Sequence, residues 1–141
     1  MKKEKKIVQK NVPNILKKDG ILFSNFRNEN KMKTNIDKII IYNDKKRSWS
    51  HCLVNSKSNS ATLICQSPGE GNRKHYHPNW DEWWFILKGK WKFEIGRKKM
   101  IIKKGDFIFI KRKTKHKITA TGKTKAIRLA VSRYDVAHIY K

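Results

Sequence analysis

Short runs of β-branched and aromatic residues, separated by polar turns, follow one another from Lys38 to Ser132. Glycine stands where tight hairpins need a positive φ, as at Gly89 and Gly96. The strand-like runs are residues 38–43, 47–54, 61–66, 82–88, 90–95, 98–103, 106–110, 116–120 and 125–132. Short strands that recur about every 8–12 residues are typical of an all-β sandwich or barrel. We therefore expect an all-β fold without a long helix.

The chain has 141 residues, a length that suits one domain with a full hydrophobic core. We expect residues 1–36 to form a basic N-terminal arm, residues 37–132 the barrel and residues 133–141 a C-terminal tail. No apolar run approaches the roughly 18 residues of a membrane-spanning helix, and no apolar segment follows the charged start. Cys52 and Cys65 stand singly in strand-like runs, which is typical of buried free thiols. The sequence thus predicts a cytoplasmic protein without a membrane partner.

The formal net charge is +24. A basic surface supplies the sequence-independent part of nucleic-acid binding. The lysines, however, are spread over nearly every segment, and Lys, Ile and Asn are all plentiful, as an AT-rich coding bias would give. We expect solvated lysine surfaces and no specific nucleic-acid partner. A milder alternative stays open, in which the positive field concentrates small anionic substrates near a cleft.

The stretch from residue 69 to residue 89 holds two histidines and a glutamate at spacings that suit a metal site. His75 and His77 are two residues apart, so on a strand both imidazoles leave the same face. Glu82 lies beyond a turn-favouring Pro-Asn pair, and its carboxylate can return toward them from a second strand. His116, on a later strand, supplies a fourth ligand once a barrel closes. Imidazole with one carboxylate suits one divalent transition metal, namely Fe, Mn, Ni, Zn or Co.

These residues match the first motif of the cupin superfamily, which the chain resembles from about Lys38 to Ser132. That motif reads G-x5-H-x-H-x4-E-x6-G, and its fixed positions are filled by Gly69, His75, His77, Glu82 and Gly89. The second motif reads G-x5-P-x-G-x2-H-x3-N. It is matched at Gly105 and His116, and it departs from the family pattern at Lys111, Lys113 and Ala120.

The resemblance implies a single-domain double-stranded β-helix, a jelly-roll barrel of two antiparallel sheets. It also implies a metal held by His75, His77, Glu82 and His116, and commonly a homodimer. The function it favours is a metal-dependent enzyme acting on a small anionic metabolite, with dioxygenase-like chemistry placed first. A metal-dependent isomerase or lyase of a sugar or carboxylic acid is the second alternative. A cupin that binds or senses a small molecule without turnover is the third.

Alternation along the strands suggests which other side chains meet a substrate. Arg73 is in phase with the two histidines of the first motif and could clasp a carboxylate or phosphate; a solvated arginine is the alternative. Arg128 is a possible second anion contact, or an exposed strand arginine. Trp84 could wall the pocket or pack in the core. Trp83 and Phe85 face the other way and could fill a sheet or dimer interface.

Overall fold

The computed structural model describes residues 29–133 in full, together with the backbone of short strands on either side. These strands are β1 (Ile7–Val8), β2 (Ile15–Lys17), β3 (Gly20–Leu22), β4 (Ser24–Asn25) and β14 (Ala137–His138). The basic arm and the tail predicted from the sequence therefore lie largely outside the described residues. Within the described part of the chain, no helix is long and apolar enough to cross a membrane.

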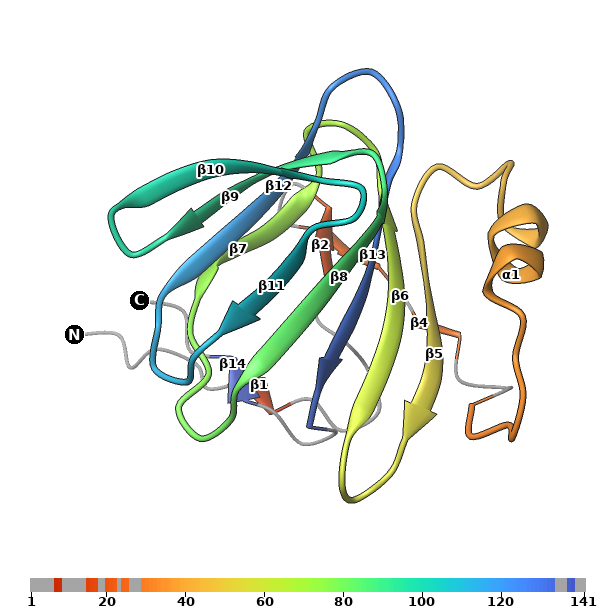
Figure 1. The fold of residues 1–141 in the computed structure, drawn as a ribbon, viewed down its shortest axis with the longest axis horizontal. Coiled ribbons are helices and arrows are strands. Elements are labelled where there is room, and N and C mark those ends of the chain that lie inside the picture. Colours follow the sequence, from red (N-terminus) through yellow and green to blue (C-terminus); the bar gives the residue numbers. More distant parts are fainter. Residues whose placement is uncertain are drawn as a thin grey trace.

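Two sheets face each other and enclose the core (Figure 1). One sheet has the strand order β10-β9-β12-β7, and the other has the order β11-β8-β13-β6-β5-β4. The pairing is antiparallel except between β4 and β5, so the predicted all-β jelly roll is confirmed. The strands not yet given are β5 (Trp49–Asn55), β6 (Ser60–Gln66), β7 (Gly71–His75), β8 (Glu82–Lys88), β9 (Lys90–Ile95), β10 (Lys98–Lys103), β11 (Phe107–Ile110), β12 (His116–Thr121) and β13 (Ala126–Ser132).

The core between the sheets is aromatic and aliphatic. Trp84 and Ile86 point inward from β8, Trp91 and Phe93 from β9, and Ile118 from β12, all of them buried. Fully burying one large apolar side chain contributes about 1.5–3 kcal/mol. A core of this kind can hold the barrel together without a metal ion.

A helix, α1 (Ile36–Tyr42), replaces the strand that we predicted over residues 38–43. Asn35 caps it, because its side-chain oxygen accepts a hydrogen bond from the Lys38 N–H at 3.0 Å. Ile36, Ile39 and Ile40 share one helical face and pack on the outer side of the six-stranded sheet. The buried residues beneath them are Trp49, Leu63, Cys65 and Ile127. The helical spacing of the isoleucines outweighs the strand preference of each β-branched residue.

Candidate metal centre

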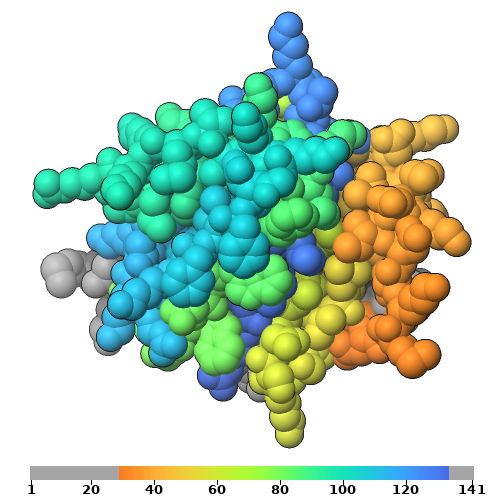
Figure 2. Space-filling view, in the orientation of Figure 1, coloured from red at the N-terminus to blue at the C-terminus, as the bar shows by residue number. Residues whose placement is uncertain are grey.

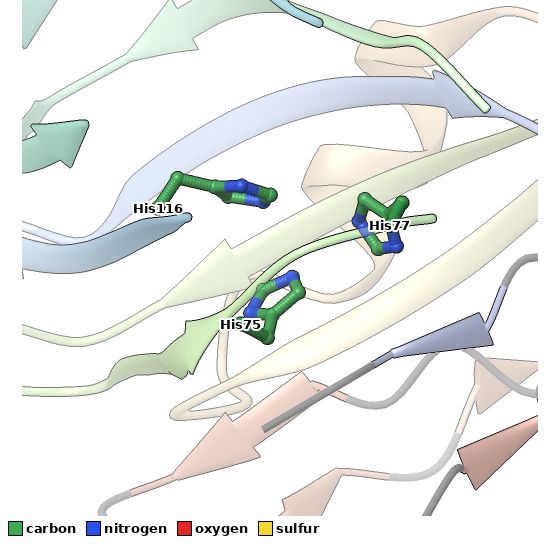
Figure 3. Close-up of side chains that lie close together, drawn as sticks. All are labelled: His75, His77 and His116. Atoms are coloured by element: carbon green, nitrogen blue, oxygen red, sulfur yellow. The ribbon is translucent and has the colours of Figure 1, made fainter. Parts of the chain in front are cut away.

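Three histidines, two from neighbouring strands and one from the segment that follows β7, meet inside the barrel (Figure 3). His75 ends β7 and His116 begins β12, and the two are register partners across the antiparallel pair. His77 follows two residues after His75. The three side chains are only 3%, 1% and 1% exposed for His75, His77 and His116 respectively. One nitrogen from each imidazole lies within 4.8 Å of the other two, so the structure brings three of the four predicted ligands together.

Hydrogen bonds fix which nitrogen two of these imidazoles present. Nδ1 of His75 lies 2.6 Å from the carbonyl oxygen of Arg73, and Nδ1 of His116 lies 2.9 Å from that of Thr114. A carbonyl oxygen only accepts, so each Nδ1 carries the proton and each Nε2 keeps its lone pair. Nε2 of His116 is buried and has no hydrogen-bond partner in the described part of the chain. A bound cation would satisfy this costly buried acceptor.

Glu82, the first residue of β8, lies beside the histidine group rather than within it. Its Oε2 is 2.8 Å from Nε2 of His77, and its Oε1 accepts a hydrogen bond from Nε1 of Trp84. Trp84 also packs edge-on against His116, with 5.9 Å between the ring centroids. Three imidazole nitrogens and a carboxylate form a donor set that suits a divalent transition metal. The residues present therefore fit the predicted ion.

The surroundings also set the charge of the donors. Burial lowers the pKa of His116 to about 4; the Glu82 carboxylate opposes this shift, and His77 adds to it. Burial alone would raise the pKa of Glu82, but the charge and hydrogen bond of His77, with His116 and Trp84, hold that pKa well below its usual range. At neutral pH His116 is therefore uncharged and Glu82 is anionic. These are the protonation states that metal ligands require.

The turn before His116 has lysine at both the proline and the glycine position of the family motif, Lys111 and Lys113. Lys113 occupies the glycine position and takes a φ of 67°, in the left-handed region. Its backbone N–H donates to the carbonyl oxygen of His77 at 2.7 Å. This hydrogen bond ties the β11–β12 turn to the segment that carries a predicted ligand.

Arg73 is exposed, so the phase that we predicted for its side chain is wrong. The cause is a bulge: the register partners of His116 and Ile118 in β12 are His75 and Asn72, which are three residues apart instead of two. Asn72, not Arg73, reaches the barrel interior. The carbonyl of Arg73 serves the site instead, through its hydrogen bond with His75.

Arg128 is buried, with only 1% of its surface exposed, which corrects the alternative of an exposed strand arginine. Its guanidinium carbon lies 5.0 Å from the ring centroid of Trp84 and 4.5 Å from that of Trp91. Nη1 donates to Oε1 of Gln66 at 2.9 Å, and Nη2 lies 3.5 Å from Oδ1 of Asn72. Burial lowers its pKa to about 9, so Arg128 remains a cation at neutral pH. Its Nε is buried and has no hydrogen-bond partner among the described residues.

Sequence reasoning missed Gln66, Asn72 and Trp91, which surround Arg128 inside the barrel. Gln66 lies in β6, Asn72 in β7 and Trp91 in β9, so the closed barrel alone brings them together. No motif or spacing in the sequence links these positions.

Residues 62–132, about half of the chain, match the family described as Cupin domain. This span contains all four predicted metal ligands. The chain is a cupin. The comparison of this cupin with curated proteins gave no match.

Solved structures agree with the family assignment. A conserved protein with a double-stranded β-helix domain from Klebsiella pneumoniae is 16% identical, with a TM-score of 0.63 over 75% of this chain and 87% of the other. A predicted oxalate decarboxylase from Thermotoga maritima is 26% identical, with a TM-score of 0.51 over 68% and 72%. A sugar phosphate isomerase from Silicibacter pomeroyi is 19% identical, with a TM-score of 0.51 over 53% and 50%. The cupin thus spans half the length of that isomerase.

Proposed function

We propose that this cupin is a metal-dependent enzyme acting on a small anionic metabolite. The observation that carries the proposal is the buried group of His75, His77 and His116, with the Nε2 of His116 lacking any partner in the described structure. Glu82 beside them completes a donor set of the kind that catalytic metals use.

Each residue has a separate task in this proposal. The histidines and Glu82 would hold the ion, which when bound supplies Lewis-acid or redox chemistry to a substrate oxygen. Trp84 orients the Glu82 carboxylate through its indole N–H. Arg128 offers a buried positive charge and a free Nε–H for the anionic group of the substrate. Arg73 is exposed, so we assign it only an attraction of the anion toward the site and no direct contact inside the barrel.

Two chemistries fit this arrangement. The dioxygenase-like reaction placed first from the sequence needs a redox metal and O₂, whereas an isomerase or lyase needs neither. The similar structures include a sugar phosphate isomerase and a predicted oxalate decarboxylase, which supports the isomerase or lyase alternative. We therefore place the non-oxidative reaction on a sugar phosphate or small carboxylic acid first. A cupin that binds such an anion without turnover is the remaining alternative.

Two further expectations accompany this proposal. The exposed side chains of Phe85, Phe107 and Phe109 lie with the half-buried Trp83 on the outer side of β8 and β11, which supports the predicted homodimer. A cytoplasmic location agrees with two buried free thiols, Cys52 and Cys65.

The test uses the full chain loaded in turn with Fe(II), Mn(II), Ni(II), Zn(II) and Co(II). Oxalate, other small carboxylic acids and sugar phosphates are incubated with each form, with and without air, and the products are analysed. Turnover without O₂ uptake is expected. O₂ consumption matched to product would move the dioxygenase reaction back to first place, and turnover that survives removal of every metal would refute the proposal.

Arg128→Met tests the predicted anion contact, and Arg97→Met, on the β9–β10 turn, is the matched control. We expect Arg128→Met to raise KM at least about tenfold with its metal content retained, because a buried charged hydrogen bond is lost. Arg97→Met should leave KM unchanged. Equal KM values for the two variants would show that Arg128 does not contribute to substrate binding.

A further inference from the structure

The outer face of the four-stranded sheet is built largely from lysine. Trp91 and Phe93 of β9 point inward, so the alternating residues Lys90, Lys92 and Glu94 point outward. Their register partners stand on the same face, from β10 on one side and β12 on the other. The exposed cations of this face, which we term the basic face, are Lys74, Lys90, Lys92, Lys99, Lys103 and Lys117.

The other sheet has a different outer surface. Its outward positions on β8 and β11 carry Trp83, Phe85, Phe107 and Phe109, and α1 covers the neighbouring strands. In β5, β6, β8, β11 and β13, the one lysine is Lys88, the last residue of β8. Within the strands, lysine is thus concentrated in the four-stranded sheet, whereas the segments around α1 and the loops carry further exposed lysines, as the sequence predicts. A coding bias alone does not explain this division.

A cavity of about 400 Å³ deepens one end of the basic face. Figure 2 shows the β9–β10 hairpin, which borders the cavity, projecting from the upper left of the molecule. Glu94 is the one acidic residue in the lining, and its carboxylate lies 3.7 Å from Nζ of Lys99. The cations that line the cavity are Lys74, Arg97, Lys98, Lys99, Lys115 and Lys117. The cavity therefore carries a large excess of positive charge.

We propose that the basic face binds the phosphate backbone of double-stranded nucleic acid without reading its sequence. Lysine ammonium groups and threonine hydroxyls are the groups that proteins use on phosphates, and Thr119 and Thr121 stand in register with Lys92 and Lys90. Lysines on alternate residues and adjacent strands form a grid of charge that a polyanion can neutralise at many points.

Other partners suit this face less well. Single-stranded nucleic acid is held by stacking on aromatic side chains, and the outward positions of β9, β10 and β12 contain no aromatic residue. Membrane-surface binding buries an apolar face, and protein interfaces use apolar or aromatic centres. Ile101 is the one large apolar side chain in the outward rows of these three strands. The chemistry of the face thus favours a duplex held through its phosphates.

The experiment measures the binding of the full chain to a fluorescein-labelled 20-base-pair DNA duplex of mixed sequence by anisotropy. About six phosphate contacts predict a log–log salt slope near −5 and roughly a thousandfold loss of affinity between 50 and 200 mM salt. The double variant Lys92→Gln/Lys117→Gln should lose about two units of that slope and weaken binding at least tenfold at 50 mM salt. Lys45→Gln/Lys57→Gln, which removes the same charge from exposed positions elsewhere, is the control.

Equal weakening by the two double variants would overturn the proposal, because binding would then follow net charge and not this face. Tighter binding to vesicles containing phosphatidylserine, or complete displacement of the duplex by tripolyphosphate at equal phosphate concentration, would also overturn it. Thermal unfolding verifies that each variant is folded. If the double variant is not, the single variants Lys92→Gln and Lys117→Gln should each reduce the slope by about one unit.

Discussion

Gly71, at the start of β7, lies against the backbone of β12. A Cβ added there would lie 1.9 Å from the carbonyl oxygen of Ile118 and 2.9 Å from the Cα of Thr119. Both contacts are with backbone, so the strand itself must move. Reaching an ordinary contact of about 3.4 Å requires a shift of about 1.5 Å. The two strands that would separate are β7 and β12, whose pairing sets His75 opposite His116.

We expect Gly71→Ala to lower the free energy of unfolding by about 3 kcal/mol, the upper end of the range for overpacking. For a chain of this size that change lowers Tm by about 10 °C. The control is Gly96→Ala, where a Cβ meets nothing within 4 Å but φ is +57°. It should cost only about 1–2 kcal/mol of left-handed strain.

The assay is urea unfolding followed by circular dichroism, with Zn(II) affinity measured on the same samples. Gly71→Ala should also lower the affinity for Zn(II), because it displaces the strand that carries His75. Equal stability losses for the two glycine variants would refute the close packing of β7 on β12.

Three other predictions address separate parts of the molecule. Burial raises the pKa of Cys52 and of Cys65 from 9.0 to about 11, so the free energy of unfolding should fall as pH rises from about 9 to 11. Replacing both cysteines by Ala should remove that part of the pH dependence, measured by urea titration at each pH. Trp84→Phe removes the N–H that orients Glu82 and should weaken metal binding about 10–100-fold in a chelator competition; unchanged affinity would exclude the orienting role. Phe109→Lys should give a monomer in sedimentation velocity, whereas Ile101→Lys, equally exposed on the other sheet, should leave the predicted dimer intact.

The strands were predictable because their local signals agree with the final packing. For β8, β9 and β10 the predicted and observed bounds coincide, the turn glycines Gly89 and Gly96 have positive φ, and burial alternates along β8 and β9. The segment around Ile39 and Ile40 is a helix where we predicted a strand, because two local preferences compete there. β-Branched residues favour strands, but the Asn35 cap and the helical spacing of the isoleucines let them cover the outer sheet.

The histidines of the candidate site were predictable because their spacing in the sequence matches the family motif, and a separation of two residues places His75 and His77 on the same side of an extended chain. Arg73 was not, since a bulge in β7 is a product of pairing with β12 and leaves no pattern in the sequence. The burial of Arg128 and the gathering of lysine on one sheet were equally hidden. Both depend on which strands become neighbours when the barrel closes.

The most direct measurement is an anomalous difference map from crystals of the protein purified without added metal. We predict one peak, at about 2.0–2.2 Å from Nε2 of each of His75, His77 and His116 and from a carboxylate oxygen of Glu82. The same crystals of His77→Ala should lose most of the peak while the barrel stays folded. The control is His51→Ala, which changes a histidine of β5 outside the histidine group and should keep the peak. A peak of full height in His77→Ala, or a peak elsewhere in the chain, would contradict the metal centre.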